Sequence, residues 1–256
     1  MKIASWNVNS LRVRLPQVLR WLDTQRPDVL AMQETKTEDK DFPVEEFSAA
    51  GYNAVCSGQP TYNGVAILSR DEPENVLTAL PDFTDPQRRV LAASIGALRI
   101  VDLYVPNGQS LESDKYRYKL DWLAQLDLWV GELTRQHPNL VLLGDFNIAP
   151  DDRDVHDPKV WAGQVLVSEP ERAAFRKFEA RGLKDSFRLH EQGGGHFSWW
   201  DYRAAGFRRN LGLRIDHILL SPALAERCAS ASIDREPRGW ERPSDHAPVL
   251  AEITLP

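Results

Sequence analysis

Cysteine and long apolar runs are both scarce in this chain of 256 residues. The two cysteines, Cys56 and Cys228, are too few for a disulfide framework and lack the spacing of a metal site, so we expect small buried side chains in a reducing cytoplasm. No run approaches the roughly 20 apolar residues of a transmembrane helix. The first residues, 1–7, lack the apolar core of a signal peptide.

An excess of positive charge is also missing, because the formal net charge is −6. This balance argues against a protein that coats DNA non-specifically, but an enzyme can grip DNA locally through a few placed arginines. Arginine pairs that could serve, or could equally be solvated surface charge, are 12 and 14, 88 and 89, and 208 and 209.

Repeats, low-complexity tracts and linkers rich in proline or serine are absent, so we expect one domain over residues 1–256. Apolar runs bounded by turn residues predict strands at 2–6, 29–33, 52–57, 64–69, 90–95, 98–104, 140–143, 215–220 and 249–254. Helical periodicity predicts helices at 15–24, 115–136 and 169–181. The mixture predicts an α/β fold built in layers.

Polar residues recur where the predicted strands end. Asn7, Glu34, Asp145 with Asn147, and Asp245 with His246 flank such strands, while Asp216 falls inside one. A gathering of carboxylates, amides and a histidine is the composition of a Mg²⁺ site that handles phosphate esters.

Each of these residues also has an ordinary structural explanation. Asp145 and Asn147 are two apart, so on an extended backbone both project to one side, yet Gly-Asp-Phe-Asn is also a common turn composition. Glu34 could be a surface residue that begins a loop, and Asn7 a helix cap.

Asp216 lies among apolar neighbours and therefore needs a partner. We expect it to pair with His246, fixing the tautomer of the ring and helping to keep it protonated toward a phosphoryl oxygen. A purely structural network around Asp216 is the alternative.

Together these segments resemble the endonuclease/exonuclease/phosphatase superfamily, and within it the exonuclease III branch of apurinic/apyrimidinic (AP) endonucleases. The matching segments are WNVNSLR (6–12), QETK (33–36), YNGVA (62–66), QRR (87–89), YVPNG (104–108), GDFNIAP (144–150), WDYR (200–203), GLRIDH (212–217) and PSDHAP (243–248). The resemblance implies a four-layer α/β sandwich of two packed mixed β-sheets flanked by helices. It also implies a Mg²⁺ or Mn²⁺ cofactor and damaged double-stranded DNA as substrate.

The resemblance also implies roles for individual residues. Glu34 would be the principal metal ligand, with Asn7 and Asp245 assisting and Asp145, Asn147 and His246 beside the ion. Asp145 would orient or deprotonate the attacking water, Asn147 and His246 would hold phosphoryl oxygens with Asp216 behind the ring, and Tyr104 would contact the phosphate or leaving oxygen.

Substrate choice would depend on a second set of residues. In the AP-endonuclease branch, an aromatic and two apolar side chains form a small pocket for a flipped-out sugar, and Trp199, Leu213 and Ile215 occupy those places here. All three could instead be core residues. Arg12, Asn63 and Arg89 lie in motifs whose family counterparts meet the DNA backbone.

Segment 161–168 matches the branch poorly, so the balance of abasic-site incision, 3′-end trimming and 3′→5′ exonuclease activity stays open. The alternatives are an exonuclease or 3′-phosphodiesterase with little AP-endonuclease activity, a phospholipid or inositol-phosphate phosphoesterase, and a catalytically dead DNA-binding or scaffold protein. We expect a cytoplasmic monomer that associates with the nucleoid when acting and has no membrane contact or obligate protein partner.

Overall fold

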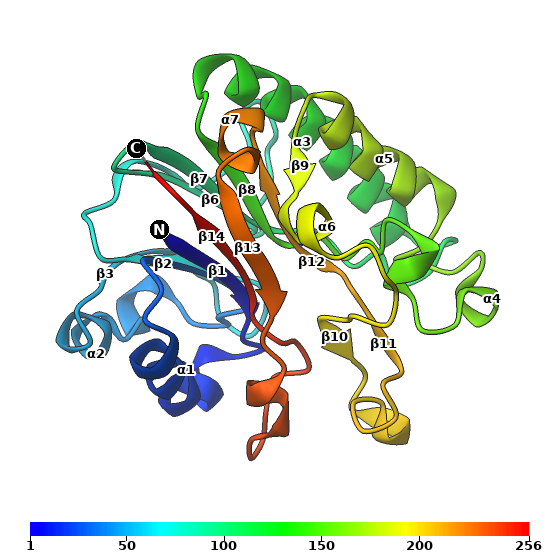
Figure 1. The fold of residues 1–256 in the computed structure, drawn as a ribbon, viewed down its shortest axis with the longest axis horizontal. Coiled ribbons are helices and arrows are strands. Elements are labelled where there is room, and N and C mark those ends of the chain that lie inside the picture. Colours follow the sequence, from blue (N-terminus) through cyan, green and yellow to red (C-terminus); the bar gives the residue numbers. More distant parts are fainter. Residues whose placement is uncertain (256) are drawn as a thin grey trace.

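Two six-stranded β-sheets form the centre of the computed structural model, which describes residues 1–255 and leaves Pro256 of the expected domain outside (Figure 1). The first sheet has the order β13-β14-β1-β2-β4-β3. Its strands are β1 (Lys2–Asn7), β2 (Val29–Gln33), β3 (Asn53–Ser57), β4 (Val65–Ser69), β13 (Cys228–Ile233) and β14 (Val249–Ile253).

The second sheet has the order β5-β6-β7-β8-β12-β9, and a separate two-stranded ribbon pairs β10 (Trp199–Trp200) with β11 (Gly212–Leu213). The strands of the second sheet are β5 (Glu74–Leu77), β6 (Val90–Ile95), β7 (Leu98–Tyr104), β8 (Leu140–Asp145), β9 (Lys184–Asp185) and β12 (Asp216–Leu220). Both sheets are mixed, because β1–β2 and β7–β8 are parallel pairs among antiparallel ones.

Helices cover the outer face of each sheet. The first sheet is covered by α1 (Leu11–Gln25) and α2 (Val44–Ala49), and the second by α3 (Asp114–Gln136) and α5 (Glu169–Ala180). Shorter helices are α4 (Pro158–Trp161), α6 (Ser186–His190) and α7 (Pro222–Ala225), with 3₁₀ turns at Asp39–Asp41, Asp152–Asp154, Arg203–Ala205 and Glu236–Gly239. The predicted four-layer α/β sandwich is confirmed.

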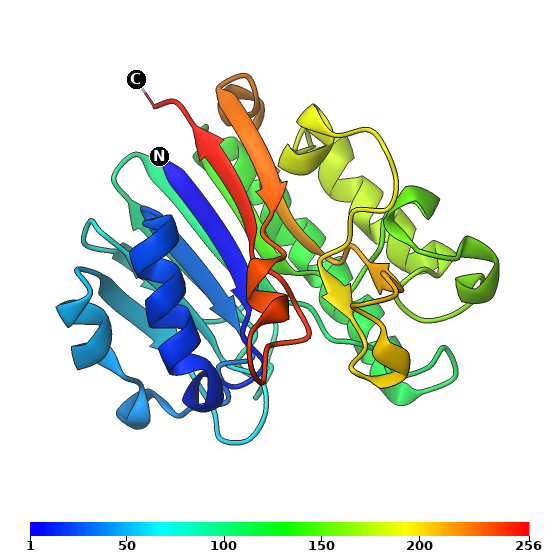
Figure 2. The ribbon, with the colours of Figure 1, turned by 60° about the horizontal axis from the view of Figure 1, so that its bottom comes forward.

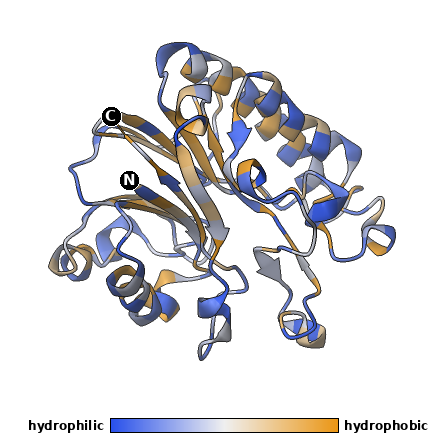
Figure 3. Cartoon of the chain, viewed as in Figure 1, coloured by the Kyte–Doolittle hydropathy of each residue, from blue (hydrophilic) through white to orange (hydrophobic). Residues whose placement is uncertain are grey.

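The apolar side chains divide into layers that match this arrangement. One cluster lies between the sheets, with Ile3, Ala31 and Leu143 among its members, and two others lie between each sheet and its helices. Figure 3 shows hydrophobic residues concentrated along the strands. Burial on both faces explains why β2, β4 and β8 have nearly continuous apolar sequences instead of alternating ones.

All of the predicted helices and strands are present, with ends shifted by a few residues. Helix α1 begins at Leu11, four residues before the prediction, and accommodates Pro16 inside it. Strand β13 was not predicted, because its alternating Ala and Ser residues lie at a partly exposed sheet edge and lack a strong apolar pattern. Cys56 and Cys228 are free but only partly buried, so the expectation of buried side chains was wrong.

Two projections extend from the same end of the molecule, as both views show (Figures 1 and 2). One is the ribbon β10–β11 with its connecting loop, and the other is the segment between β13 and β14. Strand β1 runs toward this end of the molecule. Among residues 1–255, no helix combines the length and apolar character needed to cross a membrane.

Candidate active site

The strand register of the second sheet places three of the predicted residues in one row. Asp145, the last residue of β8, pairs with Tyr104 at the end of β7 and with Asp216 at the start of β12. Buried strands hold such side chains on rigid backbone, so their relative positions are set by the sheet. Asp145 and Asp216 are each 1% exposed.

Residues from the first sheet meet this row across the sheet interface. Asn7 is the last residue of β1 and pairs with Gln33, the last residue of β2, and Glu34 follows Gln33 in the chain. The Asn7 Nδ2 group donates to Glu34 Oε1 and to Asp145 Oδ2, both at 2.9 Å. One amide thus joins two carboxylates from opposite sheets.

The segment after Asp145 departs from the extended backbone expected for it. Asn147 has a φ of 49°, in the left-handed region, and its backbone N–H donates to Asp145 Oδ1 at 2.9 Å. Its side chain Nδ2 donates to Val105 O at 2.9 Å, and its Oδ1 accepts from Asn107 at 3.1 Å. The predicted extended backbone was therefore wrong at Asn147, but the two side chains do lie on the same side, because Asn147 Nδ2 also donates to Asp145 Oδ2 at 3.3 Å.

The predicted pair of Asp216 and His246 is present. His246 Nδ1 lies 2.9 Å from Asp216 Oδ2 and 3.1 Å from Oδ1, so the ring donates through Nδ1 to this carboxylate. Its Nε2 faces Asp145 Oδ2 at 3.8 Å, which is too long for a hydrogen bond. The Nε2–H group is consequently free to donate to an oxygen placed between the ring and Asp145.

Burial and charge set the protonation of this pair. Burial alone lowers the pKa of His246, but the carboxylates of Asp216 and Asp145 outweigh it and raise the pKa to about 10, favouring the imidazolium. Burial raises the pKa of Asp145 to about 7, against the opposing effect of His246. An imidazolium has no lone pair for a metal, so His246 suits a phosphoryl oxygen better than the predicted metal role.

Glu34 is the carboxylate best prepared to stay ionised. Burial raises its pKa, but Lys36 and the Asn7 hydrogen bond outweigh burial and lower it. Lys36 Nζ lies 2.9 Å from Glu34 Oε2 and donates to Asn9 Oδ1 at 2.7 Å. Asn9 Nδ2 in turn donates to Asp245 Oδ1 at 2.9 Å.

Asn9 and Lys36 were not predicted as site residues, although each lies two positions from one that was. Both have positive φ values, 43° and 52°, as does Glu34 at 51°. Left-handed residues other than glycine are uncommon and cluster at functional sites, but they cannot be located from sequence.

The donor set fits a hard divalent cation. Carboxylate oxygens of Glu34 and Asp145 lie within 4.8 Å of each other and of a ring nitrogen of His246, so the two carboxylates could share one ion beside the imidazolium. Carboxylate and amide oxygens are the ligands that Mg²⁺ and Mn²⁺ prefer. Asp245 lies at the edge of this set, because its Oδ2 accepts from Trp199 Nε1 at 3.0 Å and its Oδ1 from Asn9. Asn147 is less suited to the predicted ligand role, since its side-chain amide is bonded to protein groups.

Tyr104 is held by residues predicted to contact DNA. Arg89 stacks on the Tyr104 ring, 4.7 Å from its centroid, and donates to Tyr104 O at 3.1 Å. Gln87 Oε1 accepts hydrogen bonds from both Arg89 and Asn63. The side chains of these two residues are mostly buried, with 9% and 7% of their surface exposed. Burial, with Glu34 and Asp145 nearby, raises the pKa of Tyr104 well above its usual range and keeps the hydroxyl protonated.

The three residues predicted to line a sugar pocket lie together, but two of them are covered. Leu213 and Ile215 are 0% and 1% exposed in a cluster with Leu166, and only Trp199 is partly open. Leu166 has a φ of 78°, a backbone conformation that disfavours a branched side chain, and is 4% exposed. Leu213 and Ile215 are therefore packed as core residues, as the alternative interpretation expected.

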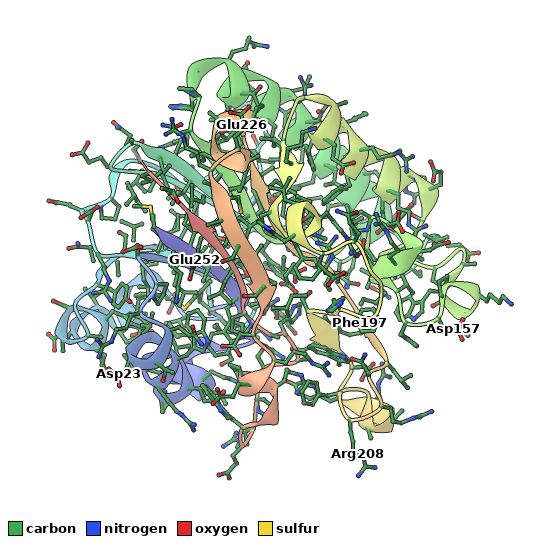
Figure 4. The ribbon with its side chains drawn as sticks, viewed as in Figure 1. Asp23, Asp157, Phe197, Arg208, Glu226 and Glu252 are labelled. Atoms are coloured by element: carbon green, nitrogen blue, oxygen red, sulfur yellow. The ribbon has the colours of Figure 1, made fainter. Side chains whose placement is uncertain are left out.

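Positively charged and aromatic residues flank the site on the surface. Arg12 is exposed at the start of α1, and Tyr62 is 67% exposed beside Asn63. Arg208 extends from the tip of the β10–β11 projection (Figure 4). Tyr202 in the same projection donates to Pro243 O at 2.8 Å, which links it to the segment that carries Asp245 and His246.

Comparison with known proteins identifies the relatives of this arrangement. Residues 4–246 match the family described as Endonuclease/Exonuclease/phosphatase. The chain is 37% identical to an exodeoxyribonuclease III of Haemophilus influenzae over 266 residues, which cover 99% of this chain and 100% of the relative.

Two solved structures extend the comparison. A 3′ phosphatase from Neisseria, NExo, bound to a product DNA hairpin, superimposes with a TM-score of 0.98 at 48% identity. An AP endonuclease from Archaeoglobus fulgidus superimposes with a TM-score of 0.95 at 40% identity. In both comparisons 100% of each chain is covered.

Proposed function

This chain belongs to the endonuclease/exonuclease/phosphatase family, and we propose that within it the chain acts at the 3′ ends of damaged DNA. It is a nuclease that hydrolyses phosphodiester bonds, a DNA-repair phosphodiesterase. The finer proposal is removal of 3′ phosphates, other 3′ blocking groups and 3′ nucleotides, with little incision at internal abasic sites.

A single observation carries the proposed chemistry. Asp145 Oδ2 accepts from Asn7 and faces His246 Nε2 at 3.8 Å, with Glu34 bonded to the same amide. A base, an imidazolium and a metal-binding carboxylate therefore converge on one space. This combination suits phosphate hydrolysis, in which negative charge grows on the phosphoryl and leaving oxygens.

The proposed cofactor is Mg²⁺, with Mn²⁺ as a substitute. Glu34 and Asp145 would hold it, assisted by Asn7 and by Asp245. When bound, the cation would neutralise charge on the phosphate and lower the pKa of water near it.

The protein's own groups account for the remaining steps. Asp145 orients the attacking water and takes its proton as the new phosphorus–oxygen bond forms. His246 donates Nε2–H to a phosphoryl oxygen while Asp216 holds the ring by Nδ1, and the neutral Tyr104 hydroxyl donates to the phosphate or the leaving oxygen. The bond between phosphorus and the 3′ oxygen breaks, and the leaving oxygen takes a proton from solvent to become a 3′ hydroxyl.

The covered pocket supports the preference for 3′ ends. Leu166, Leu213 and Ile215 are buried together in one apolar cluster, and we propose that this packing leaves no space for a flipped-out abasic sugar. A terminal 3′ phosphate can approach Asp145 and His246 without that space. The 3′ phosphatase NExo superimposes slightly better and at higher identity than the AP endonuclease from Archaeoglobus fulgidus, which agrees with this choice.

Contacts with DNA would be independent of sequence. We propose that Arg12 and the edge formed by Asn63 and Arg89 meet backbone phosphates, and that Trp199 borders the terminal nucleotide. We also propose a single domain that acts as a cytoplasmic monomer, reaching the nucleoid through its substrate and needing no obligate protein partner.

The test uses two labelled duplexes, one with a recessed 3′ phosphate and one with a central abasic-site analogue. Each is incubated with Mg²⁺ and, separately, with EDTA. We expect rapid Mg²⁺-dependent release of the 3′ phosphate and slow incision of the abasic duplex. Faster incision at the abasic site would overturn the preference, and inactivity on both duplexes alongside turnover of a phosphoinositide would overturn the DNA substrate.

A further inference from the structure

One fully buried ion pair has no part in the proposed chemistry. Lys119 of α3 and Glu171 of α5 are both 0% exposed, and Lys119 Nζ donates to Glu171 Oε1. Two buried charges are costly to desolvate, and such a pair is weak evidence for stability by itself. Its other hydrogen bonds indicate what it does here.

Lys119 is bonded to the catalytic segment. Its Nζ also donates to Asn147 O at 2.7 Å and to Asn107 O at 3.2 Å. Asn107 holds the Asn147 side chain through its own amide at 3.1 Å. The Lys119 ammonium group thus binds the backbone carbonyls of Asn107 and Asn147, and it stabilises the left-handed backbone of Asn147 next to Asp145.

Glu171 is hydrogen-bonded to the segment that carries Leu166. Its Oε2 accepts from the backbone N–H and the hydroxyl of Ser168, at 3.0 Å and 2.6 Å, which forms a capping box at the start of α5. Its Oε1 accepts from Leu166 N at 3.0 Å as well as from Lys119. A helix cap explains the bonds of Oε2 but not those of Oε1.

We propose that the Lys119–Glu171 pair determines substrate choice by positioning, because it locks the Leu166 segment into the pocket and ties it to the backbone of Asn147. The direction of this effect rests on the proposed function, in which the filled pocket excludes abasic sugars. Both residues act through others, so they are positioning residues and touch no reacting atom.

The substitution Glu171→Gln separates the two roles of Glu171. Glutamine is accepted in a capping box, so its carbonyl can keep the Ser168 bonds, but its NH₂ group accepts nothing from Leu166 or Lys119. We expect the rate of abasic incision relative to 3′-phosphate release to rise at least about tenfold. Lys119→Met should lower kcat for 3′-phosphate release about tenfold with KM little changed, since Asn147 loses its support.

Two further variants separate positioning from stability. Arg181→Met removes the ion pair between Asp127 of α3 and Arg181, which directly follows α5 at the opposite end of that helix from Glu171. This variant should lower Tm without changing the substrate ratio. The double variant Lys119→Met/Glu171→Gln leaves no buried charge unpaired, so its Tm should exceed that of either single variant while the ratio stays altered.

The two duplexes are assayed with each purified variant, after Tm is measured. A ratio for Glu171→Gln within about twofold of wild type would overturn the inference, as would an equal shift in Arg181→Met or recovery of the ratio along with Tm in the double variant. Rapid abasic incision by the wild type would overturn the proposed preference for 3′ ends but not the positioning role of the Lys119–Glu171 pair. That role is still tested by whether Glu171→Gln changes the substrate ratio while Arg181→Met leaves it unchanged.

Discussion

Replacing Leu166 tests whether the pocket is closed by a strained residue. Leu166 is 4% exposed and has a φ of 78°. Leu166→Ala removes most of the packed side chain and should cost about 2–5 kcal/mol of unfolding free energy. Leu166→Gly removes one carbon more, but glycine adopts a positive φ without penalty, which should recover about 1 kcal/mol relative to alanine.

The expected order of stability is therefore wild type, then Leu166→Gly, then Leu166→Ala, the reverse of what side-chain burial alone predicts for the two variants. Equilibrium urea unfolding with a common m-value measures it. Both variants should also increase abasic incision relative to 3′-phosphate release, because they vacate space against Leu213 and Ile215. A glycine variant less stable than the alanine variant would refute the strain argument, and unchanged substrate ratios in both would refute the role of the pocket.

Three further predictions concern catalysis, metal binding and pH. Asp145→Asn keeps the shape but removes the base, so single-turnover hydrolysis should fall at least about 100-fold while DNA affinity in fluorescence anisotropy changes little; unchanged turnover would contradict the assigned role. Glu34→Gln should weaken Mg²⁺ binding about tenfold or more in calorimetry, and a wild-type isotherm would remove Glu34 from the ligands. Burial, reinforced by Arg214, lowers the pKa of His217 to about 4. Because the unfolded chain titrates near 6.5, the folded state binds fewer protons between these values, and stability should be lost as the pH falls from about 6.5 to 4, by up to about 3 kcal/mol. His217→Asn should flatten that part of a pH series of urea melts, and an unchanged slope would contradict the prediction.

The sequence was sufficient to predict the layered α/β architecture and the row of polar residues at the strand ends. Continuous apolar runs identified β1, β2 and β8, and the residues that follow each run met because strand ends share an edge. The Asp216–His246 pair was predictable since a carboxylate among apolar neighbours requires a partner.

The remainder depends on contacts that no local pattern encodes. Strand β13 is stabilised by pairing with β14 instead of by its own apolar residues. The turn at Asn147 and the φ of Leu166 are backbone states imposed by surrounding packing. Lys119 and Glu171 are separated by 52 positions and resemble ordinary charges on helix surfaces until α3 and α5 pack together.

The preference for 3′ ends over abasic sites is tested most directly by internal competition on one DNA molecule. A duplex whose labelled strand carries both a 3′ phosphate and an internal abasic-site analogue is mixed with enzyme and Mg²⁺, and the products are resolved over time. We expect the 3′ phosphate to be released first while the abasic site stays intact. Incision at the abasic site before loss of the 3′ phosphate would contradict it.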